Sequence, residues 1–255
     1  MNPERNIRLV IAYDGTAYLG WQRQKEHPTV QGTIEDVLSR LTQQNITLNG
    51  AGRTDAGVHA WGQVASFKTR SDLPAAKLEG ALNALLPRDI LIRHVQEAPP
   101  TFHARYSSQA KIYDYMIHSQ RHPSPFLRHY AWAIREPVDL ELIKEGLLIL
   151  KGEQDFSSFQ TQGSEVSSPV RILYQARVLP IPWAGFRLRF KANGFLRHMV
   201  RNMVGILLRL GLKRITLEDL QAAIQAKDRS KTGEMAPPHG LFLRKVIYPP
   251  SSFDL

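Results

Sequence analysis

The order of predicted secondary structure in the first half of the chain is the feature that most restricts its fold. Apolar residues alternate with polar ones in some segments and recur at helical spacing in others. The predicted elements run strand, helix, strand, strand, helix, strand, at residues 6–13, 33–42, 46–48, 62–67, 74–86 and 90–95. Thr33 is the predicted N-cap of the first helix. This order is typical of a ferredoxin-like, split β-α-β unit.

The second half shows a similar pattern without any residue-level repeat. Strands are predicted at 111–117, 171–179, 185–192 and 241–248, and helices at 138–150, 195–210 and 216–226. Residues 152–169 are polar and rich in Gly and Ser, which predicts a mobile loop. We therefore expect an α+β protein of two ferredoxin-like or RRM-like halves, residues 1–108 and 109–255. Their strands would form a largely antiparallel central sheet with flanking helices and a basic cleft.

Positive charge is concentrated in one part of the chain. The net charge is +10, and the segment from Val166 to Leu217 has ten basic residues and no Asp or Glu. A field of one sign attracts polyanions, so nucleic acid is the favoured partner over a plain basic surface or an anionic membrane. Arg197 and Arg201 stand four apart on a predicted helix, where like charges repel. An acidic group is expected near them, either RNA phosphate or Asp55.

Composition excludes several kinds of chemistry. There is no Cys, which rules out disulfides, thiol catalysis and Cys-ligated zinc and fits a cytoplasmic protein. No apolar run approaches the ~20 residues that a membrane span requires. The sequence has neither a metal-binding motif nor a Gly-rich phosphate loop, so no metal and no cofactor are predicted.

A Gly-rich stretch, GAGRTDAGVHAWGQVASF, holds the strongest candidate for chemistry. Asp55 lies between Gly52 and Gly57, two residues after Arg53, in a loop that leads into a predicted strand. Such a loop either presents its carboxylate to a ligand or is a tight connection whose Asp caps its own backbone. A presented Asp can act as a nucleophile or a general base. An adjacent Arg favours its ionised form.

Two sets of aromatic residues leave alternatives open. The loop GTAYLGWQRQKEHPTVQG mixes Tyr18 and Trp21 with basic residues, which suits base stacking, or else Trp21 packs beneath the loop. Alternation in the strand at 111–117 places Tyr113 and Tyr115 on one face. These two residues line a pocket or cover a core.

Motifs along nearly the whole chain resemble the bacterial tRNA pseudouridine synthases of the TruA type. GRTDAGVHA resembles the catalytic motif of that family. Further similar stretches, in family order, are YDGTAYLGWQRQ, TVQGTIEDVL, GQVASF, FHARYSSQAKIYDYMI, SPFLRHYAW, SPVRILY, NGFLRHMVRNMVG and APPHGLFLRKVIY. The resemblance implies isomerisation of uridine to pseudouridine without a cofactor, on the 3′ side of the tRNA anticodon stem-loop (positions 38–40).

The resemblance also implies roles for individual residues. Asp55 is the expected nucleophile, attacking either the ribose or the uracil ring. Tyr113 matches a Tyr that either stacks on the target base or acts as a base that removes its proton; stacking is favoured, because a Tyr with a pKa of about 10 is a poor base at neutral pH. Arg53 matches an Arg that fills the space of the extruded base. Arg201 matches a basic residue expected to pair with the catalytic carboxylate. A homodimer is expected, with tRNA contacting both subunits.

Two other functions compete with this interpretation. A non-catalytic RNA-binding protein can be built from the same RRM-like units, which usually stack bases on sheet aromatics. A nucleoside glycosylase would also use an Asp at the sugar, but it would release free uracil.

Overall fold

A computed structural model describes residues 3–161, 163, 168–181 and 185–250. The chain divides into two compact units, residues 1–109 with 243–255, and residues 110–242. Each unit combines helices with mainly antiparallel strands, which confirms the predicted α+β class. Within the described ranges, no helix combines the length and the apolar character needed to cross a membrane.

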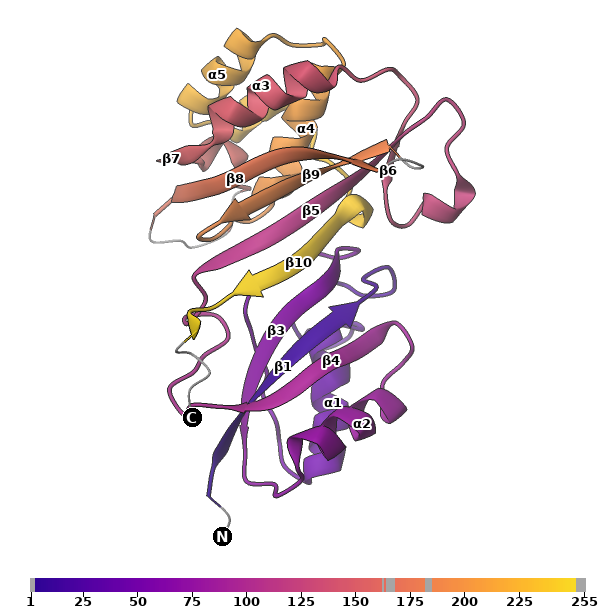
Figure 1. The fold of residues 1–255 in the computed structure, drawn as a ribbon, viewed down its shortest axis with the longest axis vertical. Helices are drawn as coiled ribbons and strands as arrows, with labels where there is room; N and C mark the ends of the chain where they lie inside the picture. Colours follow the sequence, from indigo (N-terminus) through magenta and orange to yellow (C-terminus); the bar gives the residue numbers. More distant parts are fainter. Residues whose placement is uncertain (1–2, 162, 164–167, 182–184, 251–255) are drawn as a thin grey trace. The chain divides into compact units, whose positions relative to one another are not determined.

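The first unit builds its sheet around one long antiparallel pair. Its elements are β1 (Arg5–Tyr13), α1 (Val30–Thr42), β2 (Asn49–Gly50), β3 (His59–Thr69), α2 (Ala75–Leu85), β4 (Ile90–Ala98) and β10 (Leu241–Ile247). The strand order is β4-β1-β3-β10, with the short β2 paired to β3. β10 groups with this unit from Leu243 onward, although it follows the second unit in the sequence. Figure 1 shows α1 and α2 on the same face of these strands.

The core of the first unit forms where alternate residues of β1 meet α1. Ile7, Leu9 and Ile11 of β1 are buried, as are Ile34 and Leu38 of α1. Burying such side chains contributes about 1.5–3 kcal/mol each, which holds the helix on the sheet.

α1 begins earlier than the sequence predicts. Its N-cap is Thr29 rather than Thr33, and the Thr29 hydroxyl accepts from the Gly32 amide at 3.3 Å. Gly32 weakens the helical pattern, but Thr29 satisfies one of the amides that a helix N-terminus leaves open. Glu35 therefore lies in the second turn of the helix instead of the first.

The second unit has the same kinds of element in a different order. They are β5 (Ala110–Ser119), β6 (Trp132–Ile134), α3 (Leu140–Leu150), β7 (Gly152–Asp155), β8 (Val170–Ile181), β9 (Gly185–Ala192), α4 (Met199–Gly211) and α5 (Leu217–Gln225). The strand order is β5-β9-β8-β7, and β6 pairs with β5 in parallel. Figure 1 shows α3, α4 and α5 gathered over one face of this sheet.

Two predictions about the second unit are wrong. Part of the segment predicted as a mobile loop forms β7 and a 3-10 turn, because Phe156 and Phe159 are completely buried; residues 162 and 164–167 lie outside the described part. The predicted helix at 195–210 begins only at Met199. His198 has a left-handed backbone with φ 63°, which a helix cannot include.

Candidate active site

The loop between β2 and β3 carries Asp55 and is held by its neighbours. Two backbone hydrogen bonds join it to the 18–21 segment: the Trp21 amide donates to the Thr54 carbonyl (3.0 Å), and the Gly57 amide donates to the Tyr18 carbonyl (3.3 Å). A third, from the Val58 amide to the Asp55 carbonyl (3.1 Å), lies within the loop. Asp55 itself is only half-buried. A fixed backbone with a partly exposed carboxylate is what a positioned catalytic acid requires.

Two side chains from the neighbouring strands brace the same loop. Tyr13 of β1 shares a 2.8 Å hydrogen bond with the Thr54 hydroxyl. The side-chain amide of Gln63, on β3, donates to the Gly52 carbonyl at 2.8 Å. Burial raises the pKa of Tyr13 well above its usual value, so this phenol stays protonated. The loop is thus supported by residues on both sides of Asp55.

Glycine at position 20 is required where two loops approach each other. Gly20 has φ +87°, and a Cβ there would lie 2.6 Å from the Thr54 carbonyl oxygen. Both the left-handed backbone and the close contact exclude larger residues. The segment that contains Gly20 therefore lies directly against the backbone next to Asp55.

The aromatic residues of that segment pack inside the unit. Trp21 is 2 % exposed and Tyr18 is 7 % exposed. Of the two alternatives for Trp21, packing beneath the loop is therefore confirmed, and its ring lies where a Cβ on Gly50 would otherwise stand. Arg53, by contrast, is exposed at the surface of the Asp55 loop.

Tyr113 lies on the face of β5 that the helices of the second unit cover. It is directly opposite Phe190 of β9, is 7 % exposed, and contacts the Phe195 ring edge-on at 5.1 Å. Tyr115 shares this face and donates to the Pro237 carbonyl at 2.8 Å. Both tyrosines therefore contribute to packing.

Arg201 lies in the first turn of α4 and is 8 % exposed. Its Nε donates to the Ala236 carbonyl at 2.8 Å, and the Ala236 amide donates to the Arg201 carbonyl at 3.2 Å. Burial raises the pKa of Tyr115, and the positive charge of Arg201 opposes that rise. Since a helix N-terminus already carries partial positive charge, an Arg in the first turn favours an anion nearby.

The predicted placement of Arg197 and Arg201 on one helix is wrong. Arg197 precedes α4 and is exposed, so Arg197 and Arg201 do not form a helical pair. The expectation of an acidic group near Arg201 now depends on the helix terminus instead. The exposed Arg197 adds a second positive charge to the same end of α4.

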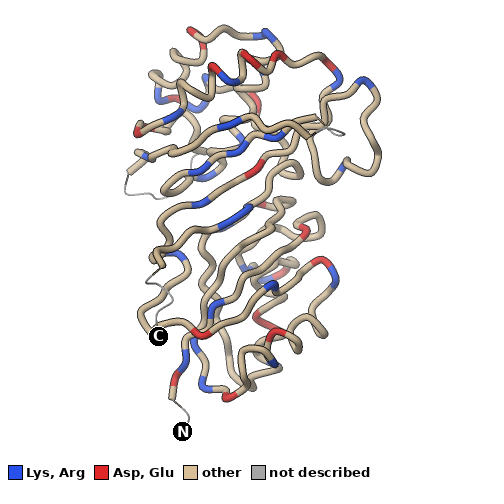
Figure 2. Tube along the Cα trace, viewed as in Figure 1, with Lys and Arg blue, Asp and Glu red and all other residues tan. Residues whose placement is uncertain are grey.

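The alternation of β9 gives this strand one basic face. Phe186, Leu188 and Phe190 are buried, whereas Arg187 and Arg189 are only partly buried. Figure 2 shows Lys and Arg recurring along the strands of this unit. Because Phe190 lies opposite Tyr113, these arginines point to the other face of the sheet. Part of the basic segment is therefore on the face away from Tyr113.

The predicted site residues are distributed over the two units. Arg53 and Asp55 share one loop of the first unit, whereas Tyr113 and Arg201 belong to the second. The braces Tyr13 and Gln63 could not be found from the sequence, since their contacts join residues far apart in the chain. Their only signal was a place beside a turn or within a strand.

Comparison with known proteins places this arrangement in a family. A family model described as tRNA pseudouridine synthase matches residues 9–107 and 148–249. Proteins called tRNA pseudouridine synthase A are similar over 96 % of this chain and 100 % of their own length. They include those of Thermoanaerobacter sp. (strain X514), 41 % identical, Thermotoga neapolitana, 40 % identical, and Caldicellulosiruptor saccharolyticus, 42 % identical.

Among solved structures, a chain of the crystal structure of a Cbf5-Nop10-Gar1 complex aligns with a TM-score of 0.33 and 16 % identity, over 79 % of this chain and 45 % of that one. This likeness is too weak to support any conclusion. The family match and the full-length relatives are sufficient by themselves: the chain belongs to the tRNA pseudouridine synthase family.

Proposed function

We propose that this protein converts uridine to pseudouridine on the 3′ side of the tRNA anticodon stem-loop, with Asp55 as the nucleophile. The observation that carries the proposal is the Asp55 loop itself. Its backbone is held by Trp21 and Tyr18, while Asp55 is only half-buried. In a family of pseudouridine synthases, a positioned carboxylate of this kind is the natural candidate for the reacting group.

The reaction is an isomerisation, so its atoms balance within the substrate. The bond between N1 of uracil and the ribose carbon breaks, the base rotates, and a carbon–carbon bond from C5 replaces it. The C5 proton is lost and N1 gains one. Asp55 attacks either the anomeric carbon or the uracil ring, and both routes leave no net oxidation or hydrolysis. We propose that no cofactor or metal takes part, and undiminished activity in EDTA is the expected result.

The other predicted residues act on the RNA in this proposal. Arg53, exposed beside Asp55, fills the space of the flipped base, whose unstacking costs a few kcal/mol. Tyr113 stacks on the target base. Arg201 supplies positive charge to the catalytic carboxylate, in accord with the place of Arg201 at the positive end of α4.

The test is to compare wild-type protein and Asp55→Asn on unmodified tRNA. The amide keeps the size of the side chain but cannot act as a nucleophile. We expect tRNA affinity to stay within about twofold and pseudouridine formation to fall by about 10⁴-fold or more. Chemical mapping of pseudouridine measures the product and its position in the tRNA.

The same assay separates the competing functions. Tight tRNA binding by wild-type protein without any pseudouridine would indicate a non-catalytic RNA-binding protein. Release of free uracil would indicate a glycosylase. Pseudouridine outside the anticodon stem-loop would contradict the proposed position but keep the chemistry.

Two further parts of the proposal concern the assembly and its place in the cell. We propose a homodimer in which one tRNA contacts both subunits, and a cytoplasmic location where tRNA is processed. Light scattering of the protein with and without tRNA tests the first. A monomeric mass with full activity would contradict it.

A further inference from the structure

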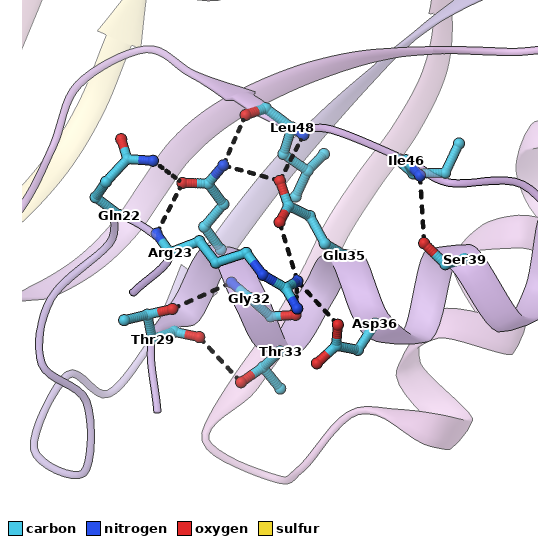
Figure 3. Close-up of polar contacts among 11 residues, drawn as sticks. Gln22, Arg23, Thr29, Gly32, Thr33, Glu35, Asp36, Ser39, Ile46 and Leu48 are labelled. Carbon is cyan, nitrogen blue, oxygen red and sulfur yellow. Dashed lines mark hydrogen bonds and ion pairs between the residues drawn. The ribbon is translucent and has the colours of Figure 1, made fainter. Parts of the chain in front are cut away.

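Two buried polar residues of α1 lie outside the proposed chemistry. Gln31 is 5 % exposed and Glu35 is 4 % exposed. They stand one helical turn apart, and the side-chain amide of Gln31 donates to the Glu35 carboxylate at 2.8 Å. Figure 3 shows Glu35 within a cluster of polar contacts that also contains Arg23 and Leu48.

Their remaining contacts all go to two other segments of the first unit. One set reaches the segment before α1: Gln22 Nε2 donates to Gln31 Oε1 at 2.8 Å, the Arg23 amide donates to the same oxygen at 3.1 Å, and Arg23 Nη1 donates to Glu35 Oε2 at 3.2 Å. The other set reaches the segment before β2: the Leu48 amide donates to Glu35 Oε1 at 2.8 Å, and Gln31 Nε2 donates to the Leu48 carbonyl at 3.1 Å.

These two segments are the ones that support the Asp55 loop. The first continues directly from Gly20 and Trp21, whose backbone contacts Thr54. The second leads through β2 into the loop itself. The helix also holds the first segment directly, because the backbone N–H of Gln31 donates to the Trp21 carbonyl at 3.0 Å. The polar pair thus fixes both approaches to Asp55 from a single helix.

We propose that Glu35, together with Gln31, is a positioning residue for Asp55, joining the 20–23 and 48–50 segments so that the carboxylate is held in its reactive place. The pair does not touch the substrate. This inference rests on the proposed function, because it assigns Glu35 a role in the reaction of Asp55.

The chemistry of the pair supports a role beyond packing. Its neighbours on the buried face, such as Ile34 and Leu38, are apolar, and an apolar residue would fill position 35 without the desolvation of a carboxylate. Glu35 instead places a carboxyl group here, and both of its oxygens accept hydrogen bonds. What the carboxylate adds, and a Leu could not, is a simultaneous connection to Leu48 and Arg23.

The experiment compares Glu35→Ala with Glu35→Gln in the full chain. Ala removes every side-chain contact of Glu35. Gln keeps an oxygen that can accept from Leu48 and Gln31, but its NH2 group faces the Arg23 guanidinium, so two donors meet and that hydrogen bond is lost. We expect the single-turnover rate of pseudouridine formation to fall about 100-fold in Glu35→Ala and about tenfold in Glu35→Gln, with tRNA affinity within twofold in both. Partial rescue by Gln is expected because the Leu48 connection remains.

A second readout follows the loop directly and does not need activity. Hydrogen exchange of the peptide that covers residues 50–58 should be faster in both Glu35 variants. Asn83→Ala is the matched control, because Asn83 joins α2 to β4 through two 2.8 Å bonds with the Ile92 backbone and contacts neither segment. It should lower stability while leaving the rate and the exchange of residues 50–58 unchanged.

The outcomes separate this inference from the proposed function. Folded Glu35→Gln and Glu35→Ala with wild-type rate and exchange would overturn the positioning role, even where Asp55→Asn is inactive. An equal loss of rate in Asn83→Ala would also overturn it, since the effect would then follow stability alone. If Glu35→Ala does not fold, Glu35→Gln and the exchange measurement decide. Wild-type protein that makes no pseudouridine would instead refute the proposed function.

Discussion

Among the described residues, Glu35 is a buried carboxylate of the first unit and Asp114 is one of the second, and the two are held in different ways. Glu35 of the first unit accepts from a backbone amide, a neutral side chain and the half-exposed Arg23. Asp114 of the second unit is completely buried and forms a two-bond ion pair with Arg189 of the adjacent strand, at 2.6 and 2.7 Å. The first connects segments distant in the chain, whereas the second joins two neighbouring strands.

The difference indicates what each carboxylate does. A group that joins loops controls where another residue lies, so its loss should appear mainly in the reaction rate. A buried ion pair between two strands has little effect on where other residues lie, because the backbone hydrogen bonds of the sheet already fix those strands. Asp114 neutralises Arg189, an arginine of the basic face of β9, so its loss should appear in stability.

The largest effect that tests this contrast is expected for Arg189→Ala. Removing the guanidinium leaves Asp114 buried with Arg187 Nε at 3.9 Å as a weak substitute. We expect the free energy of unfolding to fall by about 3 kcal/mol, measured by urea denaturation of the second unit's transition. The rate of pseudouridine formation by folded protein should change little.

Arg177→Ala is the matched control for that change. Arg177 lies directly opposite Arg189 in the β8–β9 register and is exposed. Like charges across a strand pair repel, so its removal should leave stability unchanged or slightly higher. An equal loss in both variants would mean that the ion pair with Asp114 is not what stabilises the strands.

The sequence allowed one side of this contrast to be anticipated. In the sequence, Asp114 lies between Ile112 and Met116 on one face of the predicted strand at 111–117, and residues 187–191 alternate basic with apolar side chains. The pair itself depends on strand order, which a single sequence does not determine. The register that sets Asp114 opposite Arg189 therefore became visible only in the structure.

The Glu35 cluster was harder to predict for a physical reason. With the N-cap at Thr33, Glu35 would be an acid in the first turn of the helix, where it favours the helix dipole. The N-cap is Thr29, so Glu35 lies in the second turn, where it contacts Arg23 and Leu48 from segments before and after the helix. The Asp55 loop was recognised because its signal is local, but its braces, such as Tyr13 at 41 residues from Thr54, are not.

A second prediction concerns the contact that the Glu35 cluster maintains. Gly20→Ala should push Thr54 away, since the new Cβ would lie 2.6 Å from its carbonyl oxygen in a left-handed backbone. A displacement of about 1 Å can cost about 100-fold in rate. We expect that loss in single-turnover pseudouridine formation, with tRNA affinity nearly unchanged.

Gly80→Ala provides the control, because a Cβ there meets nothing within 4 Å in the helix α2. It should raise stability by about 0.5–1 kcal/mol without affecting the rate. A wild-type rate in Gly20→Ala would show that Asp55 tolerates movement of its support. Glu35 would then have no effect on the reaction rate through this contact, and the two carboxylates would no longer differ in function.

The smallest effect concerns where the RNA lies on the second unit. Arg197 lies two residues after Phe195, which contacts Tyr113, whereas Arg177 pairs in register with Arg189, on the opposite face of the sheet. If tRNA binds on the side of Tyr113, Arg197→Ala should weaken binding. The slope of log affinity against log salt should become shallower by about 1.

Arg177→Ala removes the same charge from the other face, so its salt slope should equal that of wild-type protein. Filter binding of one unmodified tRNA over a range of salt concentrations measures both. Equal slopes for both variants and wild type would mean that neither arginine contacts phosphate. A shallower slope for Arg177→Ala alone would assign the RNA to the face that holds Asp114. In that case the ion pair between Asp114 and Arg189 would lie on an RNA-binding surface. Asp114 would then affect tRNA binding as well as stability, and the contrast with Glu35 would be weaker.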